Sequence, residues 1–141
     1  MKSHIVADLY NVPTRVFEQI LDDYDNVNRI ITRLLAKYNA TQLNYTYHKF
    51  DGFPGAFTCL YLLSESHLSI HTWPEENYVA LDCFTCGDVD TESLVKDIVA
   101  WLESSEQHMV RMERGLKGGD MKLSEKKRKN HYNAVTELGD H

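Results

Sequence analysis

The sequence predicts an α+β fold, a two-layer α/β sandwich in which two helices cover one face of an antiparallel sheet. Several stretches alternate apolar and polar residues, as half-buried strands do. The strand-like stretches in the middle of the chain follow one another through short turns, which is typical of antiparallel neighbours. Two longer stretches carry apolar residues at three- and four-residue spacing, which indicates amphipathic helices.

The first part of the chain is predicted to contain a strand, a long helix and a second strand. Residues 4–10 alternate and form the first strand. Pro13 suits the first turn of a helix, and the apolar spacing after it predicts one continuous helix over roughly 14–38. Residues 41–50 are rich in Thr and Tyr, which favours a strand, and 51–55 has the glycines and proline of a turn.

The next part is predicted to add two strands, a second helix and a last strand. Residues 56–64 and 77–86 alternate along their length. Acidic residues then precede an apolar stripe from Leu94 to Leu102, as at the start of a helix. Residues 108–113 form the last strand. Apolar periodicity fades after it, so we expect one domain over 1–115 and a charged, flexible C-terminal tail over 116–141.

The composition excludes several classes of protein. The 141 residues fit one domain, and the net charge of −6 argues against a general nucleic-acid binder, although a basic cluster lies at 126–129. No run of about 18 apolar residues exists to cross a membrane. The N-terminus lacks the features of a secretory signal. Three cysteines, an odd number, argue against a disulfide framework, so we expect a cytoplasmic protein.

The strand face that points away from the helices is too apolar to lie bare in water. It mixes four large apolar residues with three polar ones, namely Phe50, Leu60, Leu62 and Phe84 with Thr58, Asp82 and Cys86. A second copy of the sheet would cover this face, so we expect a homodimer.

Residues 64–75 hold three serines, two histidines and two acids between predicted strands, which favours a functional site. One interpretation is zinc, because His67-x3-His71 and Cys83-x2-Cys86 offer four suitable ligands. A separation of three residues within a strand, however, points Cys83 and Cys86 to opposite faces. We therefore expect no metal.

Two further interpretations of this stretch need no metal. Ser66 and His71 could form the nucleophile and base of a serine hydrolase, but the chain has no Gly-x-Ser-x-Gly elbow and no obvious third member to orient the histidine. Each residue taken singly could instead be a hydrogen-bonded polar member of the sheet. That explanation fits the whole cluster less well, because every desolvated polar group needs its own partner.

The stretch from Ser64 to Glu75, S-E-S-H-L-S-I-H-T-W-P-E, and the following Asp82-x3-Cys86-Gly87 closely resemble the processing and catalytic motif of prokaryotic S-adenosylmethionine decarboxylase proenzymes. The match has no gap across 64–87. A looser likeness extends from the first strand to 112–115, and the tail is not covered. The resemblance implies a pyruvoyl-dependent decarboxylase that acts on a small molecule, S-adenosylmethionine, and supplies spermidine synthesis.

The family's chemistry implies self-cleavage between Glu65 and Ser66. The Ser66 hydroxyl attacks the Glu65 carbonyl, the amide becomes an ester, and β-elimination followed by hydrolysis leaves a pyruvoyl group on residue 66. The substrate amine then forms a Schiff base with this group, which accepts electrons as carbon dioxide leaves.

Further roles follow from the resemblance. His71 corresponds to the histidine that assists processing, and Cys86 to the acid that protonates the product carbon. Glu75 corresponds to a carboxylate that binds the ribose hydroxyls, and Phe50 to an aromatic ring that stacks on adenine. Ser66 and His71 differ by an odd number of residues, so on a straight strand they face opposite ways. A bend or a contact across chains must bring them together.

Two positions depart from the family pattern. Thr58 stands where a processing serine is usual, and the loop over 50–58 is longer. A decarboxylase of arginine or ornithine on the same scaffold therefore stays open, as does an unprocessed non-catalytic homologue. Glu75 favours the nucleoside substrate.

Overall fold

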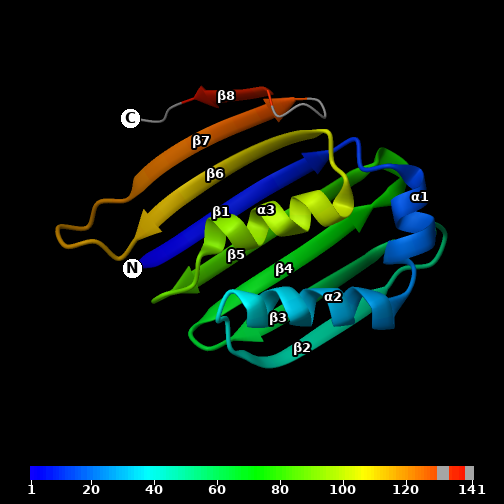
Figure 1. Cartoon of the computed structure of the whole chain (residues 1–141), viewed down its shortest axis with the longest axis horizontal. Coiled ribbons are helices and arrows are strands. Elements are labelled where there is room, and N and C mark those ends of the chain that lie inside the picture. The colour runs from blue at the N-terminus through cyan, green and yellow to red at the C-terminus, as the bar shows by residue number, and fades with distance from the viewer. Residues whose placement is uncertain (130–133, 139–141) are drawn as a thin grey trace.

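Eight strands form one sheet in the computed structural model, which describes residues 1–129 and 134–138. The strand order is β2-β3-β4-β5-β1-β6-β7-β8 (Figure 1), and every neighbouring pair is antiparallel. The strands are β1 (Lys2–Tyr10), β2 (Gln42–Lys49), β3 (Phe57–Leu63), β4 (Ser66–Trp73), β5 (Tyr78–Cys86), β6 (Glu106–Arg114), β7 (Lys122–Lys129) and β8 (Ala134–Leu138). The predicted α+β class and antiparallel sheet are confirmed.

The helices lie on one side of this sheet (Figure 1). They are α1 (Thr14–Val16), a π-helical turn η1 (Phe17–Leu21), α2 (Tyr24–Lys37) and α3 (Thr91–Leu102), and a short 3-10 turn η2 (Pro74–Glu76) links β4 to β5. Alternate residues of β1, β3 and β5, such as Ile5, Tyr61 and Leu81, are buried beneath the helices. Among the described residues no helix lies on the other side of the sheet, which we call the open face.

The prediction of one continuous helix over 14–38 was wrong, because two aspartates interrupt it. Asp23 caps α2 by accepting a hydrogen bond from the backbone N–H of Asn26 at 3.3 Å. Asp22 turns away and accepts from the N–H of Gly55 at 2.8 Å. The first bond satisfies one of the free backbone donors at the start of α2, and the second holds the loop between β2 and β3 against the end of η1.

Gly55 closes the loop between β2 and β3 against the first helical segment. Its φ is +79°, and a Cβ at this position would lie 2.6 Å from the backbone oxygen of Phe17. Only glycine fits such an approach. This contact holds the loop that carries Phe50 and Phe53 beside the start of β3.

The C-terminal part contains two strands, β7 and β8, that the sequence did not predict. β7 pairs with β6 over eight residue pairs, from Glu106↔Lys129 to Glu113↔Lys122. A separate domain boundary after 115 and flexibility of 116–141 stay predictions. None of the helices in the described residues is long and apolar enough to span a membrane.

Candidate active site

Ser66 and Cys86 lie together at one end of the sheet. Ser66 begins β4 and Cys86 ends β5, and these neighbouring strands run antiparallel. The Oγ of Ser66 is 3.7 Å from the Sγ of Cys86 and donates to the carbonyl of Ser64 at 3.2 Å. The thiol also lies 3.7 Å from Oε2 of Glu65. A small polar pocket of about 340 Å³ opens beside these residues.

The backbone between Ser64 and Ser66 is strained. Ser64 and Glu65 form the whole connection between β3 and β4, and Glu65 has a φ of +58°. A non-glycine residue in this left-handed region costs about 1–3 kcal/mol. The strained residue is thus Glu65, whose carbonyl carbon forms the peptide bond with the Ser66 nitrogen.

Thr58 and His71 form a second cluster in the open face. They are direct cross-strand partners on β3 and β4, and Thr58 Oγ1 is hydrogen-bonded to His71 Nδ1 at 3.0 Å. Phe50, Trp73 and Glu75 line the same pocket of about 300 Å³. This pocket thus holds an aromatic surface, a carboxylate and an imidazole whose ring is held in place by a hydroxyl.

The two clusters are separate within one chain. His71 lies five positions after Ser66 on β4, which corresponds to about 16 Å along a strand. Within one chain, the predicted site residues therefore form two separate groups. Ser66 lies with Glu65 and Cys86, while His71 lies with Thr58, Phe50 and Glu75.

The zinc and serine hydrolase interpretations both fail on this geometry. Cys83 is fully buried beneath the helices, away from His67 and His71, and burial raises the pKa of its thiol to about 12. It cannot join them in one metal site. His71 lies too far along the strand from Ser66 to act as its base in the same chain.

Comparison with known proteins decides the family. The model of the S-adenosylmethionine decarboxylase family matches residues 3–115. The chain belongs to the S-adenosylmethionine decarboxylase family. It is 40% identical over 114 residues to the S-adenosylmethionine decarboxylase proenzyme 2 of Bacillus anthracis, which covers 80% of this chain and 88% of that relative. It is 34% identical over 114 residues to the proenzyme of Methanococcus maripaludis, with the same shares covered.

A solved structure of the same family shares the fold. The crystal structure of the adenosylmethionine decarboxylase from Aquifex aeolicus matches with a TM-score of 0.70 and 27% identity, covering 85% of this chain and 95% of that one. The family match includes both clusters and ends before β7.

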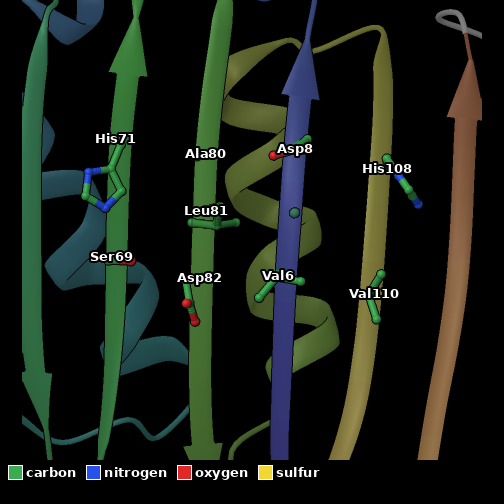
Figure 2. A pocket seen from close by; sticks show the side chains of 10 residues that line it. Val6, Asp8, Ser69, His71, Ala80, Leu81, Asp82, His108 and Val110 are labelled. Carbon is green, nitrogen blue, oxygen red and sulfur yellow. The ribbon is translucent and has the colours of Figure 1, made fainter.

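The open face of this family member also holds residues that the sequence interpretation missed. A groove of about 340 Å³ runs from His71 across β4, β5, β1 and β6, and Figure 2 shows Ser69, Asp82, Asp8 and His108 along it. Only strand pairing brings these positions together, since they lie far apart in the chain. The alternation of β1 and β5 predicts which face of its own strand Asp8 or Asp82 occupies. It does not predict that β1 and β5 are neighbours.

Asp82 is the centre of a polar network in this face. Its Oδ1 lies 2.5 Å from His4 Nε2 and 3.3 Å from His67 Nε2, and Arg114 donates to His4 Nδ1 at 3.1 Å. Three side chains of this kind can hold a metal. Here the Arg114 bond occupies the Nδ1 lone pair, so Nε2 carries the ring proton and donates to Asp82. The arrangement fits a hydrogen-bond chain better than a cation site.

Proposed function

We propose that this chain is the proenzyme of a pyruvoyl-dependent S-adenosylmethionine decarboxylase that cleaves itself between Glu65 and Ser66. The observation that carries this proposal is the placement of Ser66 Oγ beside Cys86 Sγ, next to a strained Glu65, in a member of this family. The product, decarboxylated S-adenosylmethionine, would serve spermidine synthesis.

Processing needs no external cofactor, only side chains of the protein and water. The Ser66 oxygen attacks the Glu65 carbonyl carbon, and the peptide nitrogen leaves to give an ester. Loss of the Ser66 α-proton then expels Glu65 as a free carboxylate and leaves a dehydroalanine at position 66. Water replaces its nitrogen, which departs as ammonia. Breaking this bond releases the left-handed backbone of Glu65 from its constraint, which favours cleavage.

The residues around position 66 fit a pyruvoyl group. Such a group supplies an electron sink for the pair that remains when carbon dioxide leaves. Cys86 is 3.7 Å from the present hydroxyl, so its thiol is suitably placed to deliver a proton to the substrate carbon. Glu65, once a free C-terminus, lies beside the same thiol.

A second copy of the chain would unite the two halves of the site. Leu60, Leu62 and Leu123 are 45%, 54% and 55% exposed on the open face, which supports burial against another sheet. Two such faces can stack about a two-fold axis that lies between the sheets and is perpendicular to the strands. Each strand then runs antiparallel to its copy in the facing sheet. The Ser66 end of β4 in one copy would then lie over the His71 end in the other.

In this dimer the partner supplies the residues that Ser66 lacks. His71, oriented by Thr58, would assist processing, Glu75 would accept hydrogen bonds from the ribose hydroxyls, and Phe50 would stack on the adenine. We also propose that the enzyme acts in the cytoplasm, where free thiols persist, since Cys59, Cys83 and Cys86 are all unpaired.

Intact mass and a denaturing gel test the proposal. The purified protein should give two chains, one ending at Glu65 and one starting with a pyruvoyl group, and Ser66→Ala should remain full-length and inactive. A single full-length wild-type species would contradict self-processing. Release of labelled carbon dioxide from S-adenosylmethionine, but not from arginine or ornithine, then identifies the substrate.

A further inference from the structure

A basic pocket lies on the helix side of the sheet, away from both halves of the candidate active site. It occupies the space between α3 and the strands β6 and β7, where the helices no longer cover the sheet (Figure 1). Its volume is about 220 Å³, and Ile5, Val95 and Met109 form its apolar floor. β7 lies beyond residues 3–115, so the pocket combines family residues with a strand outside the family match.

The charged side chains of this pocket are mostly cations. Lys96 on α3, Arg111 on β6, and Lys126 and Arg128 on β7 all line it, whereas Glu92 is the one acidic residue among its described lining. Glu92 lies 3.4 Å from Lys126, so its charge is already engaged. The pocket is thus positive in a chain whose net charge is −6.

Arg128 has a buried side-chain donor that lacks a partner. Its Nε makes no hydrogen bond among residues 1–129 and 134–138, although the Oε1 of Gln107, its direct strand partner, is also unpaired. A buried donor of a charged group without a partner costs stability, so such groups are normally satisfied. Asp90 lies near Lys96 and Arg111, but its carboxylate already caps α3 by accepting from the N–H and Oγ of Ser93.

We propose that this pocket binds a small phosphate-type oxyanion, as inorganic phosphate or a small phosphate monoester. Guanidinium groups recognise such oxygens through paired, charge-assisted hydrogen bonds, and Arg111 and Arg128 reach the pocket from neighbouring strands. The volume is below the range of about 300–1,000 Å³ that is usual for drug-sized ligands, which favours a small anion. Binding would tie β7 to α3 and so stabilise the folded chain.

The test is thermal unfolding of the full chain in increasing phosphate at constant ionic strength, with chloride as the reference salt. The Ser66→Ala variant is used beside the wild type, so that the result does not depend on processing. We expect the unfolding midpoint to rise with phosphate in a saturable way in both proteins. Glycerol phosphate in a parallel series distinguishes an ester from the free ion, and saturable binding of either supports the site.

Three variants identify the residues. Arg128→Gln should weaken the apparent phosphate affinity about tenfold or more. Arg128→Lys keeps the charge but loses the paired N–H donors, so it should retain only part of the affinity. Lys96→Gln, on α3, should weaken binding without a change in the strand. Lys127→Gln is the matched control, since it removes the same charge from the opposite face of β7 and should change nothing. A phosphate effect no greater than that of chloride, or an unchanged response in both Arg128→Gln and Lys96→Gln, overturns the proposal.

Discussion

Cys86 is the residue whose role separates processing from turnover. Its thiol lies beside Ser66, but the proposed cleavage needs only the Ser66 oxygen, the Glu65 carbonyl and a base. Cys86→Ala should therefore be cleaved normally and release carbon dioxide about 100- to 10,000-fold more slowly, the range expected for loss of a general acid. Cleavage is followed by gel and turnover by labelled carbon dioxide; normal turnover would remove the assigned role.

Cys83 is the matched control for that variant. It lies three residues away on the same strand but is fully buried beneath the helices. Cys83→Ala should lower stability through the loss of core packing and leave turnover per folded enzyme unchanged. A loss of turnover as large as that of Cys86→Ala would show that neither cysteine acts as the specific acid.

Thr58 tests whether the hydroxyl next to His71 matters for processing. Thr58→Val keeps the shape of the side chain but removes the 3.0 Å bond to Nδ1, so cleavage should slow roughly 10- to 100-fold. Thr58→Ser keeps the hydroxyl and should be cleaved at least as fast as the wild type. The measurement is a time course of chain cleavage during cell-free synthesis, and equal rates for all three proteins would exclude the role.

Strand alternation predicted single residues well, and contacts between strands poorly. It separated Cys83 from Cys86 correctly, because side-chain direction depends only on local parity. The network of Asp82 with His4, His67 and Arg114 was missed, because the strands that carry these side chains become neighbours only through pairing across 78 and 110 residues of chain. No local pattern encodes that proximity.

At the level of elements, the loop between β2 and β3 depends on one glycine. Gly55→Ala places a methyl group against backbone atoms of Phe17 that cannot move aside, and it keeps an unfavourable positive φ. We expect the free energy of unfolding to fall by about 2–4 kcal/mol. Gly52→Ala in the same loop is the control, because its φ of +110° is unfavourable but no atom lies within 4 Å. Urea unfolding should show a loss of about 1 kcal/mol there, and equal losses would contradict the steric argument.

Element boundaries show what periodicity can and cannot predict. The apolar stripe over 14–38 is real, but two aspartates divide it. Asp22 accepts a hydrogen bond from Gly55 in a distant loop, and Asp23 accepts one from Asn26 in its own helix. β7 was missed for another reason. Its sequence is dominated by lysine and arginine, and it is a strand because β6 offers a free edge for pairing.

At the level of the whole molecule, several carboxylates link stability to pH. Hydrogen bonds from Gly55 and Lys49 lower the pKa of Asp22, bonds from Tyr38 and Lys37 lower that of Asp97, and Arg15 lowers that of Glu103. A carboxyl group with a lower pKa in the folded state stabilises the fold above its unfolded pKa, and this contribution disappears as the pH falls through the folded value.

Stability should therefore be constant above about pH 5 and fall steadily below the ordinary values of 3.8 for Asp and 4.5 for Glu. Urea midpoints of the Ser66→Ala variant between pH 7 and pH 3 measure this. Asp22→Asn should flatten the decline, whereas Asp120→Asn, at an exposed site without a described partner, should not. An identical decline in all three proteins would exclude a contribution from Asp22.

The divided site makes a prediction about the assembly. Ser66→Ala and His71→Ala should each form uncleaved homodimers when expressed alone. In a mixed dimer, the His71→Ala chain keeps its own Ser66 and faces an intact His71 from its Ser66→Ala partner. Co-expression of the two, with tags of different mass, should therefore restore cleavage in the His71→Ala chain alone.

This outcome distinguishes catalysis across the interface from catalysis within one chain, because His71 lies five positions along β4 from Ser66 in a single copy. Leu62→Glu provides the link to dimerisation. A charge at a half-exposed position of the open face should favour the monomer in sedimentation analysis and slow cleavage in parallel. If mixed dimers form and the His71→Ala chain stays intact, or if monomeric Leu62→Glu is cleaved at the wild-type rate, the shared site is wrong and His71 must reach Ser66 within its own chain.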